Sequence, residues 1–330
     1  MMKKILSILG LSLVLVLSIG TAQADKQEDL NSQLLEAVEN NADLVVVESL
    51  IKQGADVNAR IEGGVTALMV SAAINPNPEV IETLINNGAD VKARDNEGVT
   101  ALMVSAAINP NPEVIETLIK HGVDVSAKDR NGSTALMVAV EHNPNPKVIE
   151  TLIKHGADIK EISIKAGTSL ISVAQNNKNP EIISTLIKYG ADVDERDEYG
   201  RTVLMWISWS VENPEIIETL IKHGADVKAR DNEKSTVLMI ATMANTNPEL
   251  IELLIKYGVD INAENKVKRT ALMYAAWFNS NPEVIETLIK HGADVKAKDN
   301  EGKTALDYAK ENPKIYQTDV YWKMNDMMYQ

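Results

Sequence analysis

Residues 97–130 read EGVTALMVSAAINPNPEVIETLIKHGVDVSAKDR, and variants of these 34 residues fill most of the chain. A threonine followed by a small or aliphatic residue and leucine marks the register in each copy: Thr66, Thr100, Thr134, Thr168, Thr202, Thr236, Thr270 and Thr304. A Gly-(Ala/Val)-Asp step keeps the same spacing from Gly54 to Gly292. An exact period of this size predicts a stacked solenoid rather than a single globular core.

Each copy predicts a helix, a loop, a second helix and a hairpin-like arm. Thr100 is a cap for a short first helix with small side chains. Asn111 and Pro112 favour the start of the second helix, because asparagine caps well and proline fits the first helical position. The same cap recurs at Asn77, Asn145, Asn179, Asn213, Asn247 and Asn281, with Asp43 in its place in the first copy. The turn Asp-Asn-Glu-Gly at 95–98 reverses the chain before the next copy.

The runs Thr-Ala-Leu-Met, Asn-Pro-Glu-Val-Ile and Gly-Ala-Asp-Val resemble the ankyrin repeat from residue 26 to about residue 310. The resemblance implies an all-α repeat solenoid of about nine stacked units. Two departures stand out: the period is 34 rather than 33, with the additional residue in the loop between the helices, and the family's histidine is replaced by methionine. We expect these methionines to pack in the core: Met69, Met103, Met137, Met205, Met239 and Met273. Tetratricopeptide repeats share the period of 34, but their tryptophan, glycine and tyrosine pattern is missing.

Four segments are expected along the chain. Residues 1–24 combine a basic start, an apolar stretch and small residues Ala22 and Ala24 before Asp25, which predicts a cleaved signal peptide and an exported, periplasmic or secreted product. A membrane anchor is the alternative, but the apolar stretch is short for a bilayer span. Residues 25–61 form an N-terminal capping unit, residues 62–299 seven repeats, and residues 300–330 a partial repeat with a C-terminal cap. Residues 162–166 lack the turn aspartate and glycine and predict an irregularity.

The composition argues against several functions. The net charge of −14 disfavours nucleic acid and anionic lipid as ligands, and the absence of cysteine removes thiol catalysis. Histidines recur at positions 121, 155, 223 and 291, but equivalent atoms in stacked layers lie about 10 Å apart, too far to share a metal ion. We therefore expect no metal site, no cofactor and no catalytic group.

The aromatic residues are distributed unevenly. Four tryptophans, eight tyrosines and one phenylalanine all lie at or after Tyr189, although the first half repeats the same framework. The resemblance places the end of the first helix and the hairpin tip on the concave side of the stack. Partner-binding residues are accordingly expected on these two features, with Trp206 and Tyr274 nearer the contact between repeats: Tyr199, Trp206, Trp209, Met243, Tyr274, Trp277 and Phe278. The competing interpretation is that the aromatic rings fill gaps between layers.

The favoured hypothesis is a monomeric, non-enzymatic scaffold in the cell envelope that binds another protein through its later repeats. A small-molecule binder or enzyme at the irregular unit near residues 162–175 is one alternative, and a structural spacer without a specific ligand is another. The sequence does not name the partner.

Overall fold

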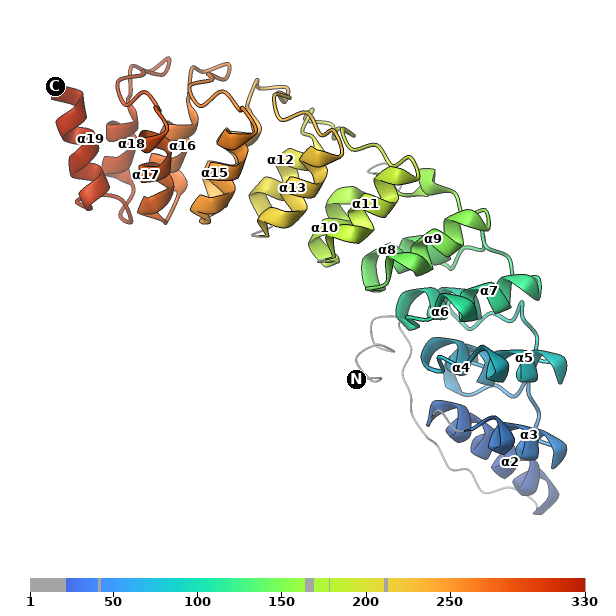
Figure 1. The fold of residues 1–330 in the computed structure, drawn as a ribbon. Helices are drawn as coiled ribbons and strands as arrows, with labels where there is room; N and C mark the ends of the chain where they lie inside the picture. Colours follow the sequence, from blue (N-terminus) through green and yellow to red (C-terminus); the bar gives the residue numbers. More distant parts are fainter. Residues whose placement is uncertain (1–21, 41–42, 164–168, 178, 211–212, 330) are drawn as a thin grey trace. The chain divides into compact units, whose positions relative to one another are not determined.

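The computed structural model describes residues 22–40, 43–163, 169–177, 179–210 and 213–329 (Figure 1). The predicted signal segment therefore lies outside the described residues up to position 21. The chain divides into two compact units, residues 1–161 and 162–330. The division falls at the segment that lacks the turn aspartate and glycine, where residues 164–168 are outside the described part.

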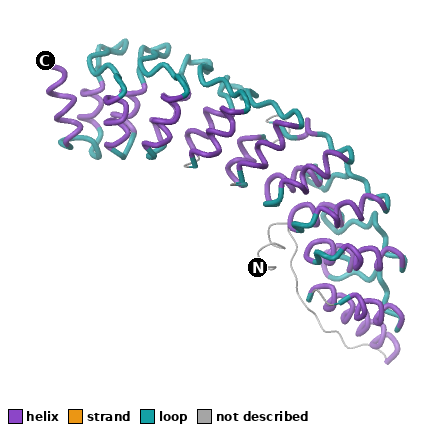
Figure 2. Tube along the Cα trace, viewed as in Figure 1, coloured by secondary structure: helices purple, strands orange, loops and turns teal. Residues whose placement is uncertain are grey.

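Helices in both units come in pairs joined by loops and arms, as the repeat predicts (Figure 2). The first unit contains α2 (Ala22–Glu39), α3 (Leu44–Lys52), α4 (Ala67–Ile74), α5 (Pro78–Asn86), α6 (Ala101–Ile108), α7 (Pro112–Lys120), α8 (Ala135–His142) and α9 (Pro146–Lys154), with short 3-10 turns at Glu62–Gly64 and Ile159–Glu161. The second unit contains α10 (Leu170–Asn176), α11 (Pro180–Lys188), α12 (Val203–Ser210), α13 (Pro214–Lys222), α14 (Val237–Ala244), α15 (Pro248–Lys256), α16 (Ala271–Phe278), α17 (Pro282–Lys290), α18 (Ala305–Glu311) and α19 (Asp319–Tyr329). First helices pack on first helices and second helices on second helices, so each unit has two helical layers.

The predicted caps account for where the helices begin. The Thr100 hydroxyl accepts a hydrogen bond from the Met103 amide, and the Asn111 side chain accepts one from the Glu113 amide. Two positions differ. Asp43, with ψ 148°, makes no side-chain capping bond, whereas the asparagine caps, with ψ 107–111°, do. Helix α10 begins after Ser169, one residue later than the repeat predicts, and the Ser169 hydroxyl caps it.

The apolar core runs through both layers. Side chains of the methionine series are all buried, as expected for a residue that fills gaps in packed interiors. In the second helices from α5 to α17 the aliphatic side chains at the third, fourth and seventh positions are buried, for example Val114, Ile115 and Leu118. Since each helix pair covers only part of its own apolar surface, burial is completed by the neighbouring pairs.

A series of buried asparagines holds successive repeats together. The Asn109 amide group donates to the carbonyl oxygens of Ala72 and Asn75 in the preceding repeat, at 2.9 and 2.8 Å, and its oxygen accepts from the Asn111 amide at 3.0 Å. Equivalent cross-repeat bonds are made by Asn143, Asn245, Asn279 and Asn312. This buried polar connection lies in the loop that contains the additional residue of the 34-residue period. We call it the asparagine ladder.

The arms are turns rather than strands. Within the described residues, only isolated bridges occur there, such as Arg94 with Thr100 and Arg230 with Thr236. The Arg94 guanidinium donates to the carbonyl of Gly98 in its own turn and to that of Lys128 in the next repeat. Each such arginine therefore connects its own turn to the arm of the next repeat through hydrogen bonds to main-chain carbonyls, and these bonds fix the position of neighbouring turns.

The two ends of the chain differ in part from expectation. The opening helix α2 spans Ala22–Glu39, so it begins three residues before the capping unit that the sequence predicts at residues 25–61. At the other end α19 packs through Val320, Tyr321 and Met324, which are buried, while Trp322 lies exposed. Within the residues that the structure describes, no helix combines the length and apolar character needed to cross a bilayer.

Candidate partner-binding surface

Four turns of the second unit form a continuous row. They comprise residues 197–201, 231–235, 265–269 and 299–303, and we call them the tip row. In each turn the first side chain, for example Asp197, accepts hydrogen bonds from the amides two and four residues later. The amides of Asn232, Lys266 and Asn300 donate to the carbonyls of Tyr199, Glu233 and Val267, at 2.9, 3.0 and 3.1 Å. These bonds place neighbouring tips in direct contact.

The first aromatic group surrounds Arg201. Its guanidinium lies 4.6 Å from the ring centroid of Tyr199 and 4.1 Å from that of Trp206, within the range of cation–π attraction. The Trp206 ring stacks on Trp209, with centroids 6.2 Å apart. Because Arg201 also bonds Asp197 at 2.9 Å, the turn and the end of helix α12 are fixed relative to each other.

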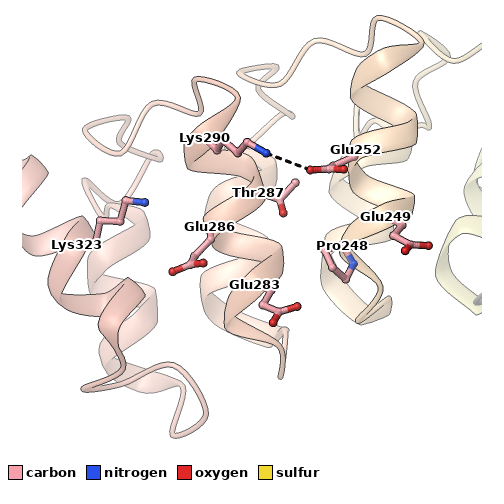
Figure 3. A pocket seen from close by; sticks show the side chains of 8 residues that line it. All are labelled: Pro248, Glu249, Glu252, Glu283, Glu286, Thr287, Lys290 and Lys323. Carbon is pink, nitrogen blue, oxygen red and sulfur yellow. Dashed lines mark ion pairs between the residues drawn. The ribbon is translucent and has the colours of Figure 1, made fainter.

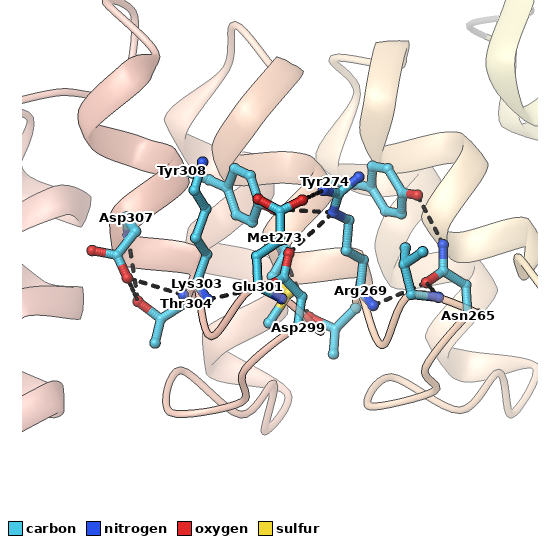
Figure 4. A network of polar contacts seen from close by, with 12 residues as sticks. Asn265, Arg269, Met273, Tyr274, Asp299, Glu301, Lys303, Thr304, Asp307 and Tyr308 are labelled. Carbon is cyan, nitrogen blue, oxygen red and sulfur yellow. Dashed lines mark hydrogen bonds and ion pairs between the residues drawn. The ribbon is translucent and has the colours of Figure 1, made fainter.

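The second aromatic group surrounds Arg269 and is drawn in part in Figure 4. The Trp277 ring stacks between Phe278 and Tyr308, with centroid distances of 4.5 and 4.7 Å. The Arg269 guanidinium lies 4.9 Å from the Trp277 centroid and bonds Asp299 at 3.2 Å. This cluster links α16 of one repeat with the turn and α18 of the next.

In three turns the first residue is hydrogen-bonded to an aromatic side chain nine positions later in the sequence. The aromatic side chain is the donor in two of these bonds and the acceptor in the third. The Trp206 indole donates to Asp197 at 2.9 Å, the Tyr308 hydroxyl donates to Asp299, and the Asn265 amide donates to the Tyr274 hydroxyl at 2.9 Å. The first unit has aliphatic residues at this position. Consequently Oδ2 of Asp95 is buried without a hydrogen-bond partner.

These contacts set the ionisation of the turn carboxylates. Burial opposes ionisation of Asp197 and of Asp299, but hydrogen bonds from Arg201, Trp206, Tyr308 and backbone amides outweigh it and lower both pKa values. At Asp95 burial dominates and raises the pKa, although backbone hydrogen bonds from Val99 and Glu97 and the charge of Arg130 oppose it. Burial and the bond to Asp299 raise the pKa of Tyr308 to about 12, so this hydroxyl stays protonated.

The predicted binding residues separate into two sets. Tyr199, Trp209 and Phe278 are exposed, at 57, 39 and 49 % of their surface. Met243 and Trp277 are half-buried, at the ends of first helices α14 and α16. The remaining two predicted residues, Trp206 and Tyr274, are also half-buried. The Trp206 indole and the Tyr274 hydroxyl are hydrogen-bonded to the turns, so these two rings mainly position the exposed aromatic side chains.

Sequence reasoning missed the basic partners of the aromatic rings. The residue before the repeat threonine is Val65, Val99 or Ser133 in the first unit, but Arg201, Arg269 or Lys303 in three turns of the second unit. The Lys303 ammonium group lies 5.3 Å from the Tyr308 ring centroid. The sequence does contain this pattern, a basic residue five positions before an aromatic one. Only the geometry of the turn shows that the two side chains are in contact.

The second helices carry a different surface. An open groove of about 400 Å³ is lined by residues of α15, α17 and α19, four of them glutamates and two of them lysines (Figure 3): Pro248, Glu249, Glu252, Glu283, Glu286, Thr287, Lys290 and Lys323. Lys290 pairs with Glu252 at 3.6 Å. In the described part of the chain, no group of three or more histidine and carboxylate side chains is arranged to hold a metal ion. The Nδ1 atoms of His155, His223 and His291 lie within hydrogen-bond distance of the carbonyl four residues earlier.

Comparison with known families identifies the class of protein. A family model described as ankyrin repeats (3 copies) matches residues 34–129, 68–163, 136–231, 212–299 and 238–318. The chain therefore belongs to the ankyrin repeat family, and its fold is an all-α repeat solenoid. Repeats of this family are generally protein–protein interaction modules, and proteins built from them are typically non-enzymatic scaffolds. None of the curated proteins matches the chain.

Proposed function

We propose that the protein is a non-enzymatic scaffold that binds another protein through the aromatic surface of its second unit. The contact residues are Tyr199, Trp209, Met243, Trp277 and Phe278. The observation that carries the proposal is the exposure of rigidly stacked rings on first-helix ends and a turn, in a chain whose first unit forms the same fold without any aromatic residue.

The physical argument concerns the energy of exposed rings. Apolar surface removed from water contributes about 25 cal/mol per Å², and aromatic residues are enriched at the energetic centres of interfaces. Stacking of Trp209 on Trp206 and of Phe278 on Trp277 restricts their rotamers before a partner arrives. Less conformational entropy is then lost on binding, which strengthens the complex.

The setting is proposed from the sequence. A basic and apolar start followed by Ala22 and Ala24 supports export to the periplasm or the exterior, with the product acting as a monomer. The alternatives are a site for a small molecule near residues 162–175 and a purely structural spacer. Neither explains why seven of the thirteen aromatic residues lie on first helices and one turn of the second unit.

The test is capture of binding proteins from envelope extract with the purified chain, followed by affinity measurement on the protein recovered. Trp209→Ala combined with Phe278→Ala is expected to lose binding, since each interface aromatic typically contributes about 2 kcal/mol, roughly 30-fold in affinity. The control is Trp322→Ala, which removes an exposed aromatic from α19. Equal binding by the double variant and the control would contradict the proposed surface.

A further inference from the structure

The tip row contains two lysines at a turn position that is glycine in five other described turns. Lys234 and Lys268 adopt left-handed backbone angles, φ 61° and 60°, that side chains other than glycine disfavour. The equivalent positions are Gly64, Gly98, Gly132, Gly200 and Gly302, all with positive φ. Lysine therefore occupies two neighbouring turns although its backbone conformation there is unfavourable. Residues held in such conformations are often found at functional sites.

The six acidic and six basic residues of the tip row balance over its four turns, and the basic excess lies in the two middle turns, 231–235 and 265–269. Glu233 pairs with Lys266 at 3.4 Å, and Glu301 pairs with Arg269 at 3.3 Å. Among the described residues neither Lys234 nor Lys268 has an ion-pair partner, and both side chains are exposed. Glu198 at the first tip is the acidic counterpart without an ion pair.

Apolar side chains lie in the same row. Tyr199 and Val267 are exposed at 57 and 40 %, and they occupy equivalent positions in their turns. The backbone bonds from Asn232 to Tyr199 and from Lys266 to Glu233 join these tips edge to edge. The tip row thus presents apolar side chains beside unpaired ammonium groups, on a protein whose net charge is −14.

We infer that the tip row docks an extended, acidic segment of the partner protein that carries large apolar side chains between its carboxylates. The inference rests on the proposed function and specifies the chemistry of the partner. Carboxylates pair with Lys234 and Lys268, and apolar side chains cover Tyr199 and Val267. Three repeat spacings of about 10 Å span about 30 Å, which matches roughly nine extended residues.

Single-stranded nucleic acid is a different class of ligand that also combines stacking with phosphate charge. The observations favour a peptide, because Glu198, Glu233 and Glu301 stand in the same row and a continuous phosphate backbone would pass close to each of them. A peptide places its carboxylates only where the lysines are. Oligonucleotide binding therefore enters the test as an opposing outcome.

The experiment measures binding of labelled synthetic probes to the full chain by fluorescence anisotropy. The probes are a nine-residue peptide with Glu at its fourth and seventh positions and Leu, Phe or Ser at the others, a peptide with Lys in place of each Glu, and a single-stranded oligothymidine. We expect the acidic peptide to bind at least tenfold more tightly than the basic peptide. We also expect its affinity to fall as ionic strength rises from low to physiological values, because exposed charges are screened.

The decisive variant is Lys234→Gly with Lys268→Gly, which restores the residue that the other turns carry. Its thermal stability is expected to equal or exceed that of the parent chain, while binding of the acidic peptide weakens about fivefold and loses part of its salt dependence. Lys222→Gln with Lys256→Gln is the control, because it removes two positive charges from second helices α13 and α15. The control is expected to bind the peptide as the parent does.

The inference is overturned if no acidic preference is found, if oligothymidine binds more tightly than the acidic peptide, or if the control loses as much affinity as the glycine variant. Failure of the proposed function gives a different result. In that case Trp209→Ala with Phe278→Ala leaves capture of the partner protein unchanged. A partner lost by the aromatic variant but retained by the glycine variant would reject the acidic segment and keep the aromatic surface.

Discussion

Replacement of one asparagine of the ladder by alanine is expected to destabilise the first unit strongly. The Asn109 side chain is buried and makes three hydrogen bonds, two of them to carbonyls of the preceding repeat. One of these acceptors, the Ala72 carbonyl, belongs to the last turn of α4, where helical carbonyls lack intrahelical donors. Alanine at position 109 leaves two buried carbonyl acceptors and the amide of the half-buried Asn111 without these partners.

The magnitude follows from these three bonds. A typical internal hydrogen bond contributes about 1 kcal/mol, and a buried group left without a partner costs about 1–3 kcal/mol. Asn109→Ala should therefore lower the free energy of unfolding by about 3–4 kcal/mol, a large fraction of the stability of a typical domain.

A matched control is offered by Asn58, which also bonds the next repeat. Its side chain donates to the Gly88 carbonyl and accepts from the Asp90 amide, each at 2.8 Å, but it is exposed, so water replaces these bonds. Asn58→Ala should cost no more than about 1 kcal/mol. Urea titration followed by far-UV circular dichroism measures both, because tryptophan fluorescence reports only the second unit. Equal losses for the two variants would refute the role given to burial in the ladder.

Three further predictions concern the turn carboxylates. Tyr308→Phe removes the hydroxyl that donates to Asp299, so the unfolding free energy should fall by about 1.5–3 kcal/mol in the same titration, whereas an unchanged midpoint would show that the bond adds nothing. The pKa values of Asp197 and Asp299 are lowered in the folded state, so the stability that their ionised forms contribute is present above pH ~4 and lost as pH falls through the folded pKa values. Asp197→Asn should therefore reduce the fall in melting temperature between pH ~4 and lower pH. An unchanged fall would contradict this role of Asp197. Burial raises the pKa of Asp95, so its ionised form destabilises the fold above that pKa; Asp95→Asn should raise the melting temperature at pH 7 and give no gain below pH ~4, and a loss at pH 7 would oppose the burial argument.

The aromatic surface of the second unit could be predicted from the sequence only in part. The sequence identified the aromatic residues of the later repeats and predicted that Trp206 and Tyr274 lie nearer the repeat contact than Trp209 and Phe278. Only the tertiary structure showed which polar group each ring binds, since the partner lies in a turn whose geometry depends on the neighbouring repeat. The two unpaired lysines likewise became visible only after the pairing of Glu233 and Glu301 was known.

The sequence by itself determined the period, the order of helices and the first residues of most of them, because caps such as Thr100 and Asn111 act within three residues of their own position. It also determined the buried methionines, because an apolar residue fixed at one place in every repeat faces the same layer. The tertiary structure decided the asparagine ladder and the start of the opening helix at Ala22. The ladder depends on contacts between residues about 34 positions apart, and such contacts exist only when one repeat lies against the next.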